Sequence, residues 1–287
     1  MTMRGLFLGL TTLDCIYRAP QAPQANQKLV ADAMTIAAGG PATNAAVTFS
    51  AVGGQATLLA AVGQHPLSSL ITQDLDQAGV ILADLSPQRQ ASPPVSSIVV
   101  TAATGERAVI SRNAVGLQVA DYQELERQIT EADILLLDGH QMTLGVQAAQ
   151  LARSLGVPVV VDAGSWKPGF DSILSQATAV IASANFRSPN GMPTLKYCQH
   201  LGVAHGAVTH GGDAINFYTG DRQGQLAVPT IEPVDTLGAG DIFHGAFCHS
   251  WTGDFAAALM RAAQVAAHSC RYFGTRAWIQ SWQAGQD

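Results

Sequence analysis

Short apolar runs alternate with longer stretches of helical length along most of this chain. The runs have the length of buried strands and are predicted at 5–10, 56–62, 134–137, 157–161, 180–182 and 206–209. Helices are predicted between or after them, at 41–52, 66–78, 144–155 and 255–271. Apolar strands separated by helices are typical of a parallel sheet that is covered on both faces. We therefore predict an α/β fold with a predominantly parallel sheet.

Two further regions have the character of strands but lack helices between them. The segment Lys28–Ile36 is strand-like, and residues 95–101 and 108–113 form a predicted hairpin that turns at Gly105. We expect these segments, from about 15–37 and 93–113, to pair as a small β-sheet lid that excludes water from a reacting group. The whole chain, 1–287, is then a single domain in which a Rossmann-like sheet carries this lid.

Composition and charge narrow the possible functions. The chain has 287 residues, of which 47% are hydrophobic and 13% charged, and its formal net charge is -6. These values predict a globular protein, and the lack of a basic run argues against nucleic acid as a partner. No apolar run reaches membrane-spanning length and the N-terminal stretch is too short for a signal peptide, so we expect no membrane association. The scattered cysteines favour buried thiols and the cytoplasm; they are Cys15, Cys198, Cys248 and Cys270.

The stretch at 234–247, V-D-T-L-G-A-G-D-I-F-H-G-A-F, carries the strongest chemical signal. Gly238, Ala239 and Gly240 precede an apolar run of helical length, so their N–H groups are expected at a helix N-terminus, where phosphate binds. Asp241 follows in the first turn, where a carboxylate can accept a proton from an attacking hydroxyl. The tetrad G-A-G-D alone is equally consistent with an ordinary helix cap. No G-x-x-x-x-G-K-[ST] motif occurs, which excludes a P-loop enzyme at the level of motifs.

The longer string D-T-L-G-A-G-D-I-F-H-G-A-F resembles the C-terminal signature of the ribokinase-like (PfkB) family of sugar kinases. The segment G-G-P-A-T-N-A-A is similar to the N-terminal G-G-x-x-x-N-x-A element of that family, and the resemblance extends from Asp14 to Gly274. It implies an ATP- and Mg²⁺-dependent kinase with Asp241 as the catalytic base and the three preceding N–H groups on the moving phosphoryl group. We expect the helix dipole to lower the pKa of Asp241.

The predicted substrate contacts come from the first half of the chain. Asp14 follows the first predicted strand, where α/β sheets bind ligands, although composition alone slightly favours a turn-forming aspartate. The paired glycines allow close backbone approach, and Asn44 offers a donor and an acceptor to sugar hydroxyls. For the two cations, a solvated surface position is favoured over a contact with the substrate. The full set is Asp14, Gly39, Gly40, Asn44, Lys28 and Arg112.

The predicted nucleotide and metal contacts come from the second half. The resemblance places the strand-end T-x-G along the nucleotide phosphates, and the Ala-rich helix with the return after it around the adenine, although close helix packing explains the alanines equally well. The nucleotide set is Thr209, Gly211, Ser183, Asn185, Ala263 and Gly274. The family resemblance also implies that Asp162 acts on Mg²⁺ through water, and that Asp235 lies beside a site for a monovalent cation such as K⁺.

Two departures from the family pattern bear on rate and specificity. Ala184 and Arg187 stand where the family carries the Asn and Glu of N-x-x-E, which puts metal dependence or catalytic rate in question. Residues 63–65, G-Q-H, replace a G-D-D-like loop, which points to altered specificity. The S-x-x-F and T-A-A-T-G-E-R segments resemble the ketohexokinase-like branch. We therefore expect transfer of the ATP γ-phosphoryl group to a primary hydroxyl of a small sugar, with a ketose as the first candidate.

Two alternatives remain open at this level. A nucleoside kinase of the same fold shares these motifs, and the departures also suit a non-catalytic sensor of sugar or nucleotide. The intact Asp241 favours an enzyme over a sensor. A lid sheet with free strand edges is a plausible surface for a homodimer.

Overall fold

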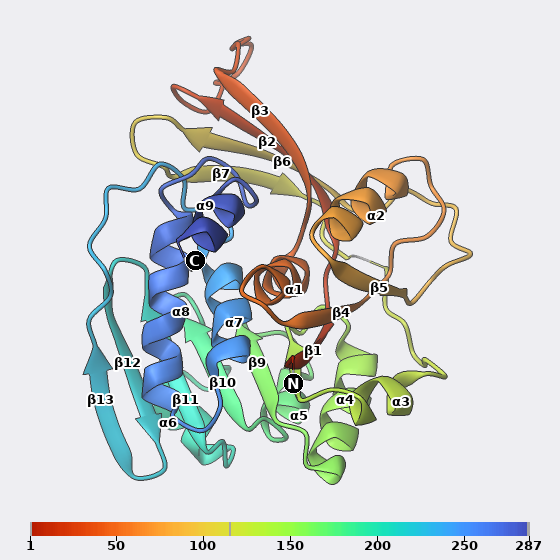
Figure 1. Ribbon diagram of the computed structural model, residues 1–287, viewed down its shortest axis with the longest axis vertical. Coiled ribbons are helices and arrows are strands. Elements are labelled where there is room, and N and C mark those ends of the chain that lie inside the picture. Colours follow the sequence, from red (N-terminus) through yellow and green to blue (C-terminus); the bar gives the residue numbers. More distant parts are fainter. Residues whose placement is uncertain (1, 115, 286–287) are drawn as a thin grey trace.

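The computed structural model describes residues 2–114 and 116–285. Within these ranges the body is a nine-stranded sheet with the order β13-β12-β11-β10-β9-β8-β1-β4-β5 (Figure 1). Its strands are β1 (Arg4–Leu8), β4 (Gln55–Ala60), β5 (Val80–Asp84), β8 (Ile134–Leu137), β9 (Val159–Ala163), β10 (Ala179–Ser183), β11 (His205–His210), β12 (Asp213–Thr219) and β13 (Arg222–Leu226). All neighbouring pairs are parallel except those that β12 makes with β11 and β13. The predicted α/β fold with a mostly parallel sheet is confirmed.

Helices cover both faces of this sheet, each over its own hydrophobic core. One core contains residues of α1 (Pro41–Ala51), α2 (Ser68–Gln77), α7 (Ala239–Ser250), α8 (Phe255–Ser269) and α9 (Trp278–Ala284). The other contains residues of α3 (Leu125–Thr130), α4 (Met142–Leu155), α5 (Phe170–Leu174) and α6 (Thr194–His200). The central strands β8 and β9 are buried along their whole length, which explains why every position in them except Asp162 is apolar.

The lid is a separate four-stranded sheet with the order β3-β2-β6-β7, and it projects from the top of the body in Figure 1. Its strands are β2 (Thr12–Ala19), β3 (Ala33–Gly39), β6 (Val95–Thr101) and β7 (Arg107–Ser111). The hairpin β6–β7 pairs with β2, and not with the strand near Lys28 as predicted. Lys28 is exposed and precedes β3, so the prediction that the strand starts at this residue is wrong.

The position of Asp14 is a second correction. We predicted it just past the carboxyl end of the first strand, at the edge of the large sheet, but it lies inside the lid strand β2, which begins only four residues after β1 ends. The apolar stretch 5–10 therefore includes a body strand and the crossing into the lid. As a result Asp14 approaches the site from the lid side, and not from the edge of the large sheet.

The lid contacts the body next to the N-terminus of α7. Ile16, Ile98 and Val100 form a small buried cluster against which Leu237 and Phe273 pack. At the turn of the β6–β7 hairpin, the carbonyl oxygen of Gly105 accepts bonds from Thr236 N at 3.2 Å and Thr236 Oγ1 at 3.0 Å. The lid is thereby held directly over the glycine-rich segment that precedes α7.

Candidate active site

The N-terminus of α7 has the conformation that its glycine-rich sequence predicts. Gly238 is the N-cap residue with a φ of 71°, a left-handed conformation that favours glycine. A Cβ atom there would also lie 3.0 Å from Thr275 Cγ2, so the close packing reinforces the need for glycine. The N–H of Ala239 donates to Thr236 O at 3.3 Å, whereas Gly240 is exposed with open space beside its Cα. Asp241 lies in the first turn of the helix.

Asp241 and Asn44 meet across the packed helices α1 and α7. Asn44 Nδ2 donates to Asp241 Oδ2 at 2.9 Å. The helices approach closely because Gly245 faces the backbone of α1, where any Cβ would overlap the carbonyl oxygen of Ala45. The structure therefore brings the predicted base and the predicted sugar-binding asparagine into direct contact.

The pKa of Asp241 is raised, contrary to our prediction. Burial is the largest cause and the neighbouring Asp162 carboxylate is the second, and together they raise the pKa to about 7. The hydrogen bond from Asn44 and the charges of His244 and Arg107 act in the opposite direction but are weaker. Our prediction considered only the dipole of α7. Desolvation and the like charge of Asp162 on β9 outweigh the effect of that dipole.

Of the residues predicted to bind the sugar, Asp14 and the paired glycines form one compact unit. Asp14 is buried, and its carboxylate accepts a bond from Thr12 Oγ1 at 2.6 Å. Burial raises the pKa of Asp14. Any Cβ at Gly39 would overlap this carboxylate, and one at Gly40, where φ is 101°, would overlap the carbonyl oxygen of Leu10. Glycine is therefore required at both positions so that lid and helix can meet here.

Asp138, which we did not single out as a site residue, braces the same region from the end of β8. Its carboxylate accepts bonds from Leu10 N at 2.8 Å and Ala42 N at 3.2 Å. The second bond caps the N-terminus of α1. Burial opposes ionisation, but the nearby His140 ring and the backbone N–H groups of Leu10 and His140 outweigh it and lower the pKa of Asp138. The D-G-H strand end was visible in the sequence, but its role in capping a distant helix was not.

The two predicted lid cations do not join this cluster. Lys28 and Arg112 are exposed in the described structure. Two other cations, which we did not predict, lie near the cluster: Arg107 at the start of β7 and Arg276 after α8. Arg107 Nη1 donates to Thr236 O at 3.3 Å, which places its charge beside the loop that leads into α7.

The predicted phosphate and metal residues lie on adjacent strand ends. Ser183 of β10 pairs in register with Thr209 of β11, and Gly211 follows in the turn with a φ of 65°. Asp162 on β9 is buried, which raises its pKa, and Oδ2 lies 3.6 Å from His244 Nδ1. Within the described ranges, no three His, Cys, Asp or Glu side chains are arranged to hold a metal ion. A single carboxylate suits Mg²⁺, which keeps several waters and substrate phosphates as ligands.

The loop in place of N-x-x-E is closed by its own hydrogen bonds. Ser183 Oγ donates to Gly164 O at 3.3 Å and accepts from Asn185 N at 3.1 Å. Arg187 Nη1 donates to Ala184 O at 2.6 Å, so the arginine side chain folds back on the segment that carries it. These contacts stabilise the loop without the family's acidic residue.

The remaining predicted residues, Asp235, Gly274 and Ala263, lie in buried or closely packed positions. Asp235 is buried and accepts from Leu237 N and Gly274 N, both at 2.8 Å, and burial raises its pKa. Gly274 also packs against the lid, because a Cβ there would lie 3.0 Å from Thr35 Cγ2. Ala263 is 6% exposed within a hydrophobic core, a placement that matches the helix-packing alternative.

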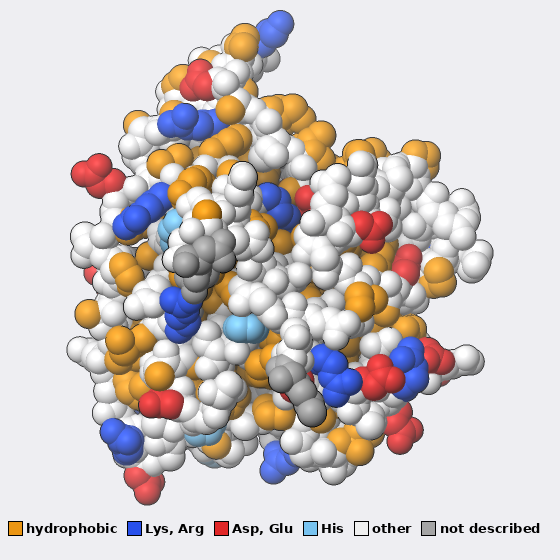
Figure 2. All heavy atoms as spheres, in the orientation of Figure 1, with side chains coloured by type: hydrophobic (Ala, Val, Ile, Leu, Met, Phe, Trp, Pro, Cys, Tyr) orange, Lys and Arg blue, Asp and Glu red, His pale blue; other side chains and the backbone are white. Residues whose placement is uncertain are grey.

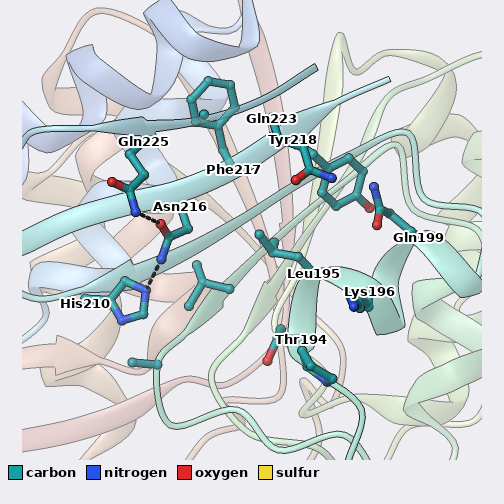
Figure 3. A pocket seen from close by; sticks show the side chains of 14 residues that line it. Thr194, Leu195, Lys196, Gln199, His210, Asn216, Phe217, Tyr218, Gln223 and Gln225 are labelled. Atoms are coloured by element: carbon teal, nitrogen blue, oxygen red, sulfur yellow. Dashed lines mark hydrogen bonds between the residues drawn. The ribbon is translucent and has the colours of Figure 1, made fainter. Parts of the chain in front are cut away.

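A separate groove of about 810 Å³ lies between α6 and the β12–β13 hairpin (Figure 3). Gln225 Nε2 donates to Asn216 Oδ1 at 2.8 Å, and Asn216 Nδ2 lies 3.0 Å from His210 Nε2, so one wall is a ladder of polar side chains. The groove adjoins the ends of β10 and β11, but none of the residues clustered around Asp241 lines it.

The sheet, the lid and a helix that carries a carboxylate in its glycine-led first turn define a small-molecule phosphotransferase without a P-loop. The sequence profile described as "pfkB family carbohydrate kinase" matches residues 5–282. The chain therefore belongs to the PfkB family of carbohydrate kinases, as its motifs predicted.

Relatives with assigned activities match over most of their length. An ATP-dependent ribose-1-phosphate kinase of Halopiger xanaduensis is 28% identical over 88% of this chain and 86% of its own. The ribokinase of Bacillus subtilis is 23% identical over 94% and 93%, and the ketohexokinase of Mus musculus 24% identical over 92% and 95%. The crystal structure of Arabidopsis thaliana ribokinase with ribose and ATP superposes with a TM-score of 0.78 at 19% identity, covering 96% of this chain and 94% of that chain. That structural likeness supports the fold.

Proposed function

We propose that this protein transfers the γ-phosphoryl group of ATP to a primary hydroxyl of a small sugar, with a ketose as the first candidate. The observation that carries the proposal is the contact between Asp241 and Asn44 beneath the lid, because it joins a base to a group that binds hydroxyls. The family membership supports sugar phosphorylation, and the presence of a ketohexokinase among the relatives supports testing ketoses first.

In the proposed reaction, Asp14 and Asn44 hold the sugar hydroxyls and Asp241 orients the attacking primary hydroxyl. A pKa of about 7 suits Asp241 to this role, since a base is most effective when its pKa lies near the working pH. Because phosphoryl transfer proceeds through a loose transition state, the proton moves to Asp241 late in the step. The N–H groups of Gly238 and Gly240, together with that of Ala239 in exchange for its bond to Thr236 O, then stabilise charge on the transferring oxygens.

ATP is proposed to lie along the ends of β10 and β11, with Thr209, Gly211, Ser183 and Asn185 near its phosphates. Mg²⁺ neutralises phosphate charge when bound, and Asp162 would contact it through water. The proposal also includes a monovalent cation beside Asp235, whose buried carboxylate retains lone pairs beyond its two N–H bonds. Activation by K⁺ over Na⁺ at constant ionic strength tests that part.

The function is tested by ADP release from Mg²⁺-ATP against ketoses, aldoses, sugar acids, sugar phosphates and nucleosides. Turnover with a ketose and not with nucleosides supports the proposal. If a nucleoside is the preferred substrate, the protein is instead a nucleoside kinase. Thermal stabilisation by a sugar without ADP release would instead indicate a sensor. Asp241→Asn is the control for the chemistry in each assay.

We also propose that the lid forms a homodimer in the cytoplasm. On its outer face Ile36, Cys15, Ser97 and Ile110 lie in one row across the four strands. Met34, Ile36 and Ile110 are 51%, 44% and 80% exposed, and hydrophobic side chains are visible over the lid in Figure 2. Light scattering at micromolar concentration should give twice the chain mass, and Ile110→Lys should halve it.

No helix in the described ranges has the length and apolar character needed to span a membrane.

A further inference from the structure

Arg276 links the return after α8 to the sugar side of the site. Nε and Nη2 donate to Asp74 Oδ2 at 3.2 and 2.9 Å, and Nη2 also donates to Ala38 O at 2.6 Å. Nη1 donates to Thr275 Oγ1 at 3.0 Å and to Asn44 Oδ1 at 3.1 Å. All five N–H groups of a guanidinium can thus be satisfied at once.

The guanidinium is itself held rigidly. Asp74 on α2 forms a partly buried ion pair with it, and the same Asp74 oxygen accepts from Ala38 N at 3.0 Å. The ion pair therefore binds both the N–H and the carbonyl group of Ala38, the residue directly before the paired glycines. The Nη1 atom that faces Asn44 is consequently fixed with respect to the sugar-binding segment.

This fixed donor selects one orientation of the Asn44 side-chain amide. With Oδ1 towards Arg276, Nδ2 faces Asp241 and donates to it at 2.9 Å. In the flipped orientation the NH₂ group would face guanidinium N–H groups, and the amide oxygen would face the carboxylate, so both contacts would become repulsive. Asp241 alone selects the same orientation only while it is ionised, whereas Arg276 does so at every working pH.

We propose that Arg276 is a positioning residue for the acceptor sugar, which it serves by holding the Asn44 amide with its NH₂ group towards Asp241 and the bound hydroxyl. The inference rests on the proposed sugar kinase function and deepens it. One Asn44 N–H bonds the base, and the second is free to bind the acceptor oxygen that this base must deprotonate. The C-terminal return therefore serves the acceptor side of the reaction as well as the predicted nucleotide side.

Arg276→Lys tests the proposal with charge retained. A lysine has three donors on one point and cannot bond Asp74, Ala38 and Asn44 in a planar fork, so the orientation of the amide is released. We expect the KM for the sugar to rise at least tenfold and kcat to fall, with the KM for ATP within twofold of wild type. Arg153→Lys is the matched control, because Arg153 on α4 is exposed and donates to Ser175 O at 2.8 Å.

A double-mutant cycle separates positioning from general loss of structure. In an Asn44→Ala background there is no amide to orient, so Arg276→Lys should then change the sugar KM by less than twofold. Millimolar guanidinium chloride should partly restore the sugar KM of Arg276→Ala, and should leave that of Asn44→Ala unchanged. Urea unfolding of each variant shows whether the fold is retained.

Three outcomes would overturn the inference. The first is an unchanged sugar KM in Arg276→Lys, and the second is an equal factor of change in the sugar and ATP KM values. The third is a sugar KM in the double variant that changes by the product of the factors measured for Arg276→Lys and Asn44→Ala alone. Each of these outcomes is compared with an active wild-type enzyme, so it would refute the role of Arg276 and leave the proposed function supported. If the wild type phosphorylates no compound of the panel, the proposed function fails and the positioning role is overturned with it.

Discussion

Asp241→Asn should strongly lower turnover and, at the same time, stabilise the fold in alkaline solution. The folded protein raises the pKa of this carboxyl from 3.8 to about 7, so ionising it in the folded state is unfavourable. For a carboxyl whose folded pKa lies above its unfolded value, stability falls as pH rises through this interval, and the penalty is complete above pH 7. An asparagine carries no such charge.

The magnitude follows from the same interval. At about 1.4 kcal/mol per pKa unit, the penalty reaches about 4 kcal/mol at pH 8 and only about 2 kcal/mol at pH 5. Each kcal/mol corresponds to roughly 2 °C in a chain of this size. We therefore expect the Tm of Asp241→Asn to exceed that of wild type by about 8 °C at pH 8 and by about half as much at pH 5.

Differential scanning calorimetry at the two pH values checks this, with Asp76→Asn on the exposed side of α2 as the control. In parallel, kcat should fall by about 100-fold or more, the scale of a lost general base, while ATP binding by calorimetry stays within about twofold. A Tm difference that is independent of pH would refute the electrostatic reasoning. Retained kcat would refute the assignment of the base.

Three further outcomes follow from the geometry. Gly39→Ala should raise the sugar KM by about tenfold with ATP binding unchanged, because its Cβ would overlap the Asp14 carboxylate; steady-state kinetics with each substrate varied checks this. Gly245→Ala should destabilise the fold by about 1–3 kcal/mol in urea unfolding, since its Cβ would overlap the backbone of α1. The kcat/KM for sugar should fall as pH drops through about 7, where Asp241 becomes protonated. Asp162→Asn should move this fall to lower pH, because it removes a neighbouring negative charge. A pH profile of kcat/KM that does not move would contradict the assignment of Asp241 as the base.

The body strands could be predicted because burial on both faces leaves little choice of residue. The strand at Ile134–Leu137 was predicted with its observed bounds. The hairpin β12–β13 was not predicted, since β13 is an edge strand with the largely polar sequence R-Q-G-Q-L. The pairing of the lid strands was wrong because β2 follows β1 so closely that the sequence shows no boundary between them.

Within the site, motifs predicted the positions of Asn44 and Asp241 but not what surrounds them. Arg276 is a single arginine in a loop, and no local pattern distinguishes it from a surface cation. Its partner Asn44 is 232 residues away in the chain. The raised pKa of Asp241 was missed for the same reason, because it depends on burial and on Asp162, and both arise only in the folded chain.

The separation of these partners also has a consequence for synthesis of the protein. Asn44 emerges early from the ribosome, Asp241 follows 197 residues later and Arg276 comes last of the three. A nascent chain can form the lid and the early strands, but it lacks the base and the residue that orients the asparagine amide. On the roles proposed above, a chain interrupted before Asp241 cannot phosphorylate a sugar, and a chain interrupted between Asp241 and Arg276 would have the base without the residue that orients the asparagine amide.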